Sequence, residues 1–306
     1  MVMLRWARAA VLLVAVLPSD AFAWTPGTHI LLGEAVLRST AILPAALAAL
    51  LREHPWDFLY GSIAADTSIA KKYARFGRHC HSWTVGFEIL HGARDARLQA
   101  FSWGYLAHLA ADVVAHNYFV PHQLAVTSST TALGHSYWES RFETHLSQRF
   151  PSRAVEVIRR EHAASDAHLD RVLSPTIFST STNRRIFRGM VHATDNAGWQ
   201  RVFALVAANS RWDLAEVAVG RHLARSFDYV MDLLIREAGS IPYTYDPSGD
   251  QALRAAKQIR RSAIKEGGPD AAVEAAHRDF GLRASPLMYA ASLPEPLYLP
   301  ARSPIN

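Results

Sequence analysis

Apolar residues recur at intervals of three and four over most of the chain, the spacing of helices that bury one face. Stretches with this pattern cover residues 25–38, 44–53, 85–93, 98–119, 154–164, 165–173, 183–193, 199–209, 213–238 and 251–266, and another helix opens at Gly134. No stretch alternates apolar and polar residues as half-buried strands do, and no internal repeat is visible. The sequence therefore predicts an all-α, multi-helix bundle, with Pro121 ending the helix over 98–119.

The first 23 residues differ from the rest. A basic start, an apolar run over residues 9–17 and a small-residue site ending at Ala23 form the pattern of a secretory signal peptide. The apolar run is too short to cross a bilayer, and no later stretch reaches the roughly 20 apolar residues that a crossing needs. We therefore expect residues 1–23 to be removed, leaving Trp24 as the new N-terminus of an exported protein, periplasmic or secreted.

The remaining chain divides near residue 238. Residues 24–238 form the predicted helical domain, and residues 239–306 form an extension with a loop, a basic helix and a proline-rich tail. We expect the tail after Ser285 to be extended over the surface or disordered, because it carries five prolines.

Composition narrows how the fold is stabilised. Half of the residues are apolar and 19% are charged, so the chain can bury a substantial core. Cys80 is the single cysteine, which rules out an intramolecular disulfide and leaves packing, or packing together with metal, to hold the fold. The net charge of +5 suits an anionic lipid surface or a phosphate substrate.

Three potential metal ligands stand in one row in the middle of the chain. His108, Asp112 and His116 are separated by four residues each, within a run that no glycine or proline interrupts, so they share one helical face. Chance would give roughly 0.04 such motifs in a chain of this composition. Two imidazoles and a carboxylate suit a divalent ion such as Zn²⁺, and the central carboxylate can bridge two ions.

Further candidates flank this row. His135 and Glu139 repeat the i, i+4 spacing, and Asp66 ends an apolar approach. In chain order the full set is Trp24, His29, Asp66, His81, His108, Asp112, His116, His135 and Glu139.

In order and residue type, these nine residues resemble the ligands of the zinc-dependent phospholipases C, and the related single-strand nucleases of the P1/S1 type share the order. The resemblance is close from residue 24 to the 140s and loose in the helical remainder. It implies up to three zinc ions in a multi-helix bundle. The implied ligands of one ion are Asp66, His81, His108 and bridging Asp112; of a second, His116, His135 and Glu139; of the third, the α-amine and carbonyl of Trp24 with His29 and Asp112. An α-amine at Trp24 exists only after the signal peptide is removed.

Some positions depart from the family pattern. Three residues separate Asp112 from His116 where the family usually has five, a spacing that resembles the catalytic domain of GPI-specific phospholipase D. His122 is therefore an alternative to His116. His79 competes with His81, which is favoured because an aromatic residue follows two positions later. Glutamate at position 139 favours the phospholipase branch over the nuclease branch.

The resemblance implies an exported zinc phosphodiesterase that hydrolyses phospholipids, with phospholipase C regiochemistry favoured. Metal-activated water would attack phosphorus, and Asp66 would orient or deprotonate that water. The alternatives are phospholipase D-type cleavage, single-strand nuclease activity on the same site, or a zinc-binding, membrane-associated helical protein without turnover. The expected partners are a phospholipid or other phosphodiester and a peripheral membrane surface, with nucleic acid less favoured.

Two other groups of residues are better explained by structure than by chemistry. Aromatic residues that could line a lipid-binding rim more often belong to packing: Trp56, Phe58, Tyr60, Trp83, Trp103, Tyr137 and Trp138. A basic cluster of Arg184, Arg185 and Arg188 could meet a phosphate, but a solvated helix face is the more frequent role of such a run.

Overall fold

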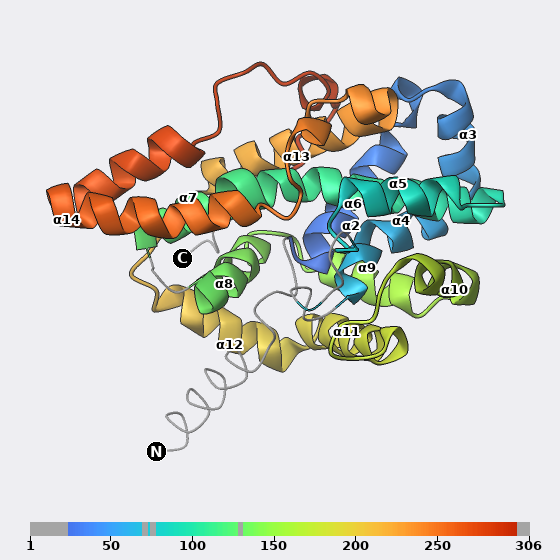
Figure 1. The fold of residues 1–306 in the computed structure, drawn as a ribbon, viewed down its shortest axis with the longest axis horizontal. Helices are drawn as coiled ribbons and strands as arrows, with labels where there is room; N and C mark the ends of the chain where they lie inside the picture. Colours follow the sequence, from blue (N-terminus) through green and yellow to red (C-terminus); the bar gives the residue numbers. More distant parts are fainter. Residues whose placement is uncertain (1–23, 69–72, 74–77, 128–130, 299–306) are drawn as a thin grey trace, which may run out of the picture.

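The computed structural model describes residues 24–68, 73, 78–127 and 131–298 (Figure 1). The predicted signal peptide lies outside these residues. The described chain is helical and contains no strand, which confirms the all-α prediction. The helices are α2 (Pro26–Arg38), α3 (Ala45–Glu53), α4 (Pro55–Ala64), α5 (Trp83–His91), α6 (Ala96–Val114), α7 (Val120–Thr127), α8 (Thr131–Glu143), α9 (Arg149–Ile158), α10 (Ala163–Val172), α11 (Thr180–Thr194), α12 (Ala197–Ala208), α13 (Glu216–Arg236) and α14 (Asp250–Phe280). Among the described helices, none is both long enough and apolar enough to cross a membrane.

Helix α6 is the centre of the fold. It is buried on nearly every side from Leu98 onward and contacts α4, α5 and α13. In Figure 1, α6 runs across the middle of the molecule, with α13 above it and α11 and α12 along the lower side. A helix enclosed in this way can hold polar side chains away from water, provided that those side chains have partners.

Two glycines bring α4 and α6 together backbone to backbone. A Cβ on Gly61 would lie 1.9 Å from the Phe101 carbonyl oxygen, and a Cβ on Gly104 would lie 2.1 Å from that of Phe58. No side chain fits at either position. This crossing lies one turn before His108 on α6, and it leads from α4 directly to Asp66 in the following 3₁₀ turn η2 (Ala65–Thr67).

The prediction that Pro121 ends the central helix is wrong. After α6 the chain makes a π-helical turn, η4 (Ala115–Phe119), and continues into α7. Pro121 stands in the first turn of α7, where a missing N–H and a fixed φ are tolerated. The helix therefore continues through the proline.

The helix expected over residues 154–164 is also different in the structure. Helix α9 begins earlier and ends at Ile158, and α10 starts at Ala163. The His162 ring nitrogen Nε2 donates to the Val157 carbonyl at 2.8 Å, which satisfies one of the carbonyls left open at the end of α9.

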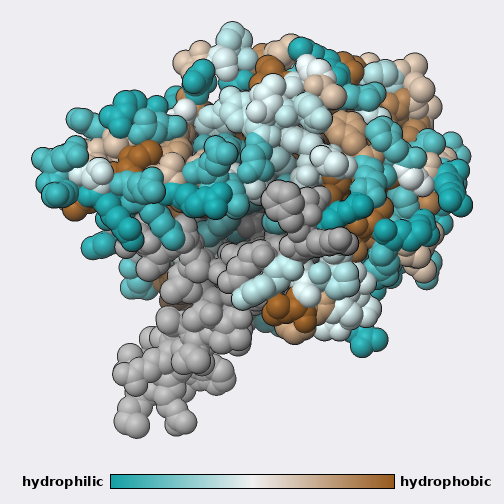
Figure 2. Space-filling model, in the orientation of Figure 1, coloured by the Kyte–Doolittle hydropathy of each residue, from teal (hydrophilic) through white to brown (hydrophobic). Residues whose placement is uncertain are grey.

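The C-terminal extension lies against the helices that precede it. The predicted basic helix is longer than expected, since α14 runs to Phe280 with a kink at Gly268, where φ is +76°. It contacts α7 and η4. Hydrophilic residues gather over α14, at the left of Figure 2.

The described part of the tail is docked and not disordered. The buried carboxylate of Asp228 on α13 accepts the backbone N–H groups of Met288, Tyr289 and Ala290 at 2.8–3.0 Å. Three such bonds to one charged group hold this segment over α13.

Candidate metal centre

The eight predicted ligand side chains come from five segments and are all buried. None of them is more than 8% exposed: His29, Asp66, His81, His108, Asp112, His116, His135 and Glu139. They come from α2, η2, the segment before α5, the α6–η4 helix and α8. Imidazoles and carboxylates gathered at such depth need partners, because an unpaired buried polar group is costly.

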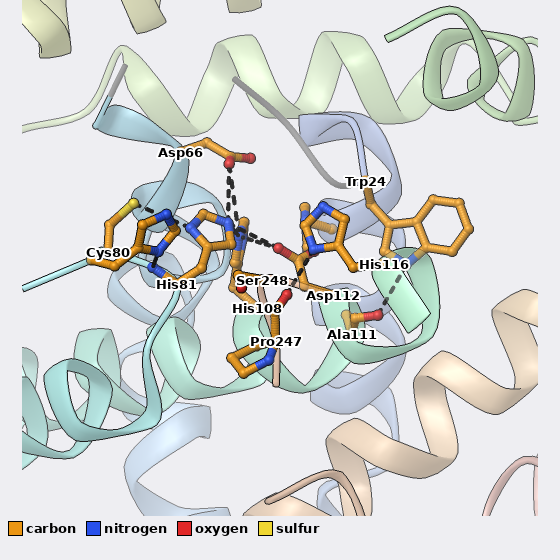
Figure 3. A network of polar contacts seen from close by, with 12 residues as sticks. Trp24, Asp66, Cys80, His81, His108, Ala111, Asp112, His116, Pro247 and Ser248 are labelled. Atoms are coloured by element: carbon orange, nitrogen blue, oxygen red, sulfur yellow. Dashed lines mark hydrogen bonds and ion pairs between the residues drawn. The ribbon is translucent and has the colours of Figure 1, made fainter. Parts of the chain in front are cut away.

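Asp112 lies at the centre of the first group. Its Oδ2 is 2.9 Å from His81 Nε2 and 3.1 Å from His108 Nε2, and its Oδ1 is 3.2 Å from His29 Nε2. Asp66 Oδ1 approaches the same two imidazoles, 3.5 Å from His81 Nε2 and 3.9 Å from His108 Nε2 (Figure 3). One oxygen of Asp112 thus faces two histidines while the other faces a third, as in a carboxylate that bridges two ions.

These atoms fit a cation better than they fit one another. Among the described residues, both oxygens of Asp112 and Nε2 of His29 are buried and make no hydrogen bond, although they lie about as close as hydrogen-bonded atoms do. Lone pairs that converge in this way suit a divalent metal held by nitrogen and oxygen ligands.

The electrostatics keep the ligands in the forms that bind metal. Burial by itself would raise the pKa of Asp112, but the charge and close approach of His108, together with the close approach of His29 and His81, hold it well below its usual range. Burial, followed by the proximity of His108, lowers the pKa of His29. The carboxylate is therefore ionised and the His29 imidazole is neutral at pH 7, as coordination requires.

Backbone carbonyls orient two of the imidazoles. His108 Nδ1 donates to the Ser62 carbonyl at 2.9 Å, and His116 Nδ1 donates to the Pro247 carbonyl at 2.7 Å. A carbonyl oxygen only accepts, so Nδ1 carries the proton and Nε2 is left with its lone pair. Both Nε2 atoms are then available to bind a metal ion.

A second group lies on the α8 side. His116, His135 and Glu139 each place a ligand atom within 4.8 Å of those of the other two. His135 Nε2 is 2.5 Å from Glu139 Oε1, and the rings of His116 and His135 are 5.2 Å apart. The i, i+4 pair on α8 thus faces the π-helical turn that carries His116.

The structure distinguishes the two alternative histidines from the favoured ones. His122 lies on α7 with its Nε2 3.1 Å from Nδ1 of His277 on α14, and it belongs to neither group. His79 accepts the backbone N–H of His81 at 3.1 Å and forms a separate potential ligand group with Cys80 and His81. His116 and His81 are the residues brought to the centre.

Trp24 is anchored beside the central helix. Its indole is fully buried, with ring centroids 4.2 Å from Phe142 and 5.2 Å from Phe119. Its Nε1 donates to the Ala111 carbonyl at 3.1 Å, one residue before Asp112 (Figure 3). The residue expected to become the N-terminus is therefore held next to the metal ligands.

The remaining candidates have structural roles. Arg184 pairs with Asp166 and Asp170, and Arg188 pairs with Asp166, so these two guanidinium groups already have carboxylate partners. Of the aromatic residues proposed as a rim, Phe58, Tyr60 and Trp138 lie in the core.

One buried carboxylate escaped the sequence reasoning. Glu143 follows Glu139 by one turn of α8, and that i+4 spacing is the signal that could have revealed it. Burial raises the pKa of Glu143 to about 7, although bonds from the Thr25 hydroxyl and the Gly27 N–H oppose the rise. Its carboxyl faces the start of α2, close to Trp24, and Glu143 also lines a cavity of about 230 Å³ between α8 and α12.

Comparison with known proteins gives one match. The family described as zinc dependent phospholipase C matches residues 28–184, about half of the chain, and this range contains all eight buried ligand side chains. No curated protein and no solved structure matches the chain.

Proposed function

Because the chain belongs to the zinc-dependent phospholipase C family, we propose that it is an exported phospholipase that hydrolyses phospholipids on the glycerol side of phosphorus. The observation that carries this proposal is the environment of Asp112, a buried, ionised carboxylate with three imidazole nitrogens at 2.9–3.2 Å. A family match to a zinc enzyme and a buried set of converging metal ligands support each other.

The proposed centre holds up to three zinc ions. Asp66, His81, His108 and Asp112 hold the first, and His116, His135 and Glu139 hold the second. The third takes Asp112 as a shared ligand, together with His29 and the α-amine and carbonyl of Trp24. The anchoring of the Trp24 indole beside Ala111 supports this last assignment, since it keeps the mature N-terminus near Asp112.

Bound zinc supplies Lewis acidity, which stabilises negative charge on phosphate oxygens and lowers the pKa of a water. The chain's own residues supply orientation and proton transfer. Asp66 orients the attacking water and accepts its proton, with Oδ1 lying 3.5 Å from His81 Nε2. The water oxygen forms a new bond to phosphorus, the bond from phosphorus to the diacylglycerol oxygen breaks, and that oxygen takes up a proton.

Export is part of the proposal because the site needs it. While residues 1–23 are attached, the nitrogen of Trp24 is a peptide amide, which is a poor metal ligand. Removal of the signal peptide turns it into an amine and completes the third zinc site. The mature protein is periplasmic or secreted and acts at a membrane surface.

Phosphorus NMR of mixed phospholipid micelles tests the reaction. The mature protein starting at Trp24 is incubated with the micelles after zinc loading, with a chelator-treated sample as control. A zinc-dependent signal from a phosphorylated headgroup supports the proposal, and phosphatidic acid reassigns the chemistry to the phospholipase D type. An unchanged spectrum with zinc still bound contradicts phospholipid hydrolysis, and single-stranded nucleic acid is then the next substrate.

A further inference from the structure

A short loop ahead of α14 contacts His116 of the second ligand group and the segment that follows His81. This loop comprises residues 245–249, and we call it the clamp loop. The Pro247 carbonyl accepts from His116 Nδ1 at 2.7 Å (Figure 3). The Asp246 carbonyl accepts from the Asn117 side-chain amide at 2.8 Å. Two successive carbonyls of the loop therefore bind two successive residues of η4.

The same loop is tied to the segment that carries His81. The Tyr245 carbonyl accepts from Trp83 Nε1 at 2.8 Å, two residues beyond that ligand. Each of the three carbonyls at positions 245, 246 and 247 thus receives a side-chain donor from the neighbourhood of a metal ligand.

The conformation of the clamp loop is fixed from within. The Asp246 carboxylate accepts the Ser248 N–H at 2.9 Å and the Ser248 hydroxyl at 2.7 Å, and the Gly249 N–H closes a turn onto the Asp246 carbonyl at 3.1 Å. The bonds within the loop therefore orient its carbonyls without any contribution from His116.

Gly249 allows the loop to approach His116 closely. Its φ is +60°, and a Cβ at this position would lie 2.4 Å from both the carbonyl oxygen and the Cβ of His116. Only glycine has both the left-handed conformation and the missing side chain that this approach needs.

His116 is a ligand that needs such support. It stands in the π-helical turn η4, a rare form of backbone that is frequent at functional sites. A hydrogen bond from Nδ1 to a fixed carbonyl selects the tautomer with a lone pair on Nε2 and orients the ring.

We propose that the clamp loop is a positioning element for His116 and sets the affinity of the second zinc ion. The loop lies outside residues 28–184, so this chain completes the second site with a segment beyond the part that matches the family. The inference rests on the proposed function in one respect, namely that His116 binds zinc.

Two glycines with positive φ at α14 provide a matched test. Gly249→Ala and Gly268→Ala each place a Cβ on a left-handed residue, at φ +60° and +76°, but a Cβ on Gly268 meets no atom within 4 Å among the described residues. Zinc affinities of the mature variants are measured by competition with a chromophoric chelator. We expect Gly249→Ala to weaken one zinc ion about 10- to 100-fold and to leave the others unchanged, while Gly268→Ala binds all zinc as the wild type does.

Asn117→Ala keeps the test valid if Gly249→Ala does not fold. It removes the bond to the Asp246 carbonyl without placing any atom in the loop, and we expect a weakening of the same zinc ion. Nitrogen-15 NMR of labelled histidine supplies a readout independent of metal. In the zinc-free protein, Asn117→Ala should lose the fixed Nδ1–H tautomer of His116.

The outcomes separate this inference from the proposed function. If the wild type binds no zinc at His116, His135 and Glu139, the proposed function fails. If the wild type binds zinc there and both Gly249→Ala and Asn117→Ala bind it equally well, the positioning role of the clamp loop is overturned while the proposed function stands.

Discussion

At the scale of single residues, the centre depends on one buried carboxylate and the imidazoles around it. Asp112 stays ionised because His29, His81 and His108 offset the cost of its burial, while burial keeps His29 neutral. A neutral imidazole such as that of His29 does not neutralise a buried charge, whereas a bound cation does. The ligand set is therefore favourable with metal and costly without it.

Asp66→Asn tests the proposed proton acceptor. The amide keeps the shape and burial of the carboxylate but cannot take a proton, so turnover should fall about 10²- to 10⁴-fold while the fold is kept. The kcat for phospholipid hydrolysis is compared with the zinc content of the same sample, which separates lost chemistry from lost metal. Undiminished turnover in a zinc-loaded variant would remove the catalytic role of Asp66.

His29→Ala tests the third zinc site. Since His29 Nε2 lies against Oδ1 of Asp112 and His29 is assigned to the third ion alone, its removal should cost one zinc ion per chain and leave the others bound. Metal analysis of the purified variant gives the count. His222→Ala is the control, because His222 is a half-buried histidine that donates to the Ala218 carbonyl and belongs to neither ligand group. Wild-type zinc content in His29→Ala would contradict the assignment.

Glu143→Gln tests the carboxyl at the end of α8 that faces the start of α2. Its folded pKa of about 7 lies above the ordinary value of 4.5, so the folded state holds a proton that the unfolded state releases. This contribution is complete below pH 4.5 and is lost as the pH rises to 7. The glutamine variant stays neutral, so it should be more stable than the wild type at pH 8, by at most about 3 kcal/mol, and equally stable at pH 4.5. Urea unfolding at both pH values measures this, with exposed Glu53→Gln as a control; equal stability at pH 8 would refute the buried-carboxyl account.

Residue type and spacing pointed to His108, Asp112 and His116 and to His135 with Glu139, because such residues at i, i+4 positions carry a visible pattern, and the family resemblance supplied the other candidates. The groups that orient these side chains carry no pattern in the sequence. The Ser62 and Pro247 carbonyls belong to the backbone, and any residue at those positions offers the same oxygen. Pro247 is also 131 residues from His116, so only the folded chain reveals the pair.

At the scale of elements, the crossing of α4 and α6 places Asp66 against His108. Apolar periodicity predicted most helices, but it does not show which pairs of helices approach to backbone contact. The crossing requires a glycine on each helix at the point of contact. In the sequence, a glycine inside a helix indicates only a low helix propensity at that position. Apolar periodicity likewise gives no sign of the π-helical turn η4. A proline inside a helical pattern normally indicates the end of the helix, so the sequence predicts an end at Pro121 that the structure does not have.

Gly104→Ala tests this crossing. The added methyl group would meet the Phe58 carbonyl, a backbone atom that cannot move without its helix, so we expect a loss of about 3 kcal/mol or more and weakened zinc binding. Gly189→Ala on α11 is the matched control, since its Cβ would meet no atom within 4 Å among the described residues. The control should gain about 0.5–1 kcal/mol. Denaturant unfolding measures both, and a Gly104→Ala variant as stable as the wild type would show that the helices do not cross as described.

At the scale of the whole molecule, metal binding links segments that are far apart in the chain. The ligands come from α2, η2, the segment before α5, the α6–η4 helix and α8, and the clamp loop and α14 close over His116. With one cysteine the chain has no intramolecular disulfide, so packing stabilises it and the proposed zinc centre would add to that stability. Binding energy from such a centre becomes folding energy, and chelation should lower the melting temperature of the mature protein.

Native mass spectrometry of the mature protein starting at Trp24 tests the central claim most directly, because it counts the zinc ions on the folded chain. We predict up to three zinc ions per chain, lost together on strong chelation and restored by added zinc, with one ion fewer in His29→Ala. A compactly folded chain that retains no stoichiometric zinc would contradict the metal centre, and with it the proposed hydrolysis.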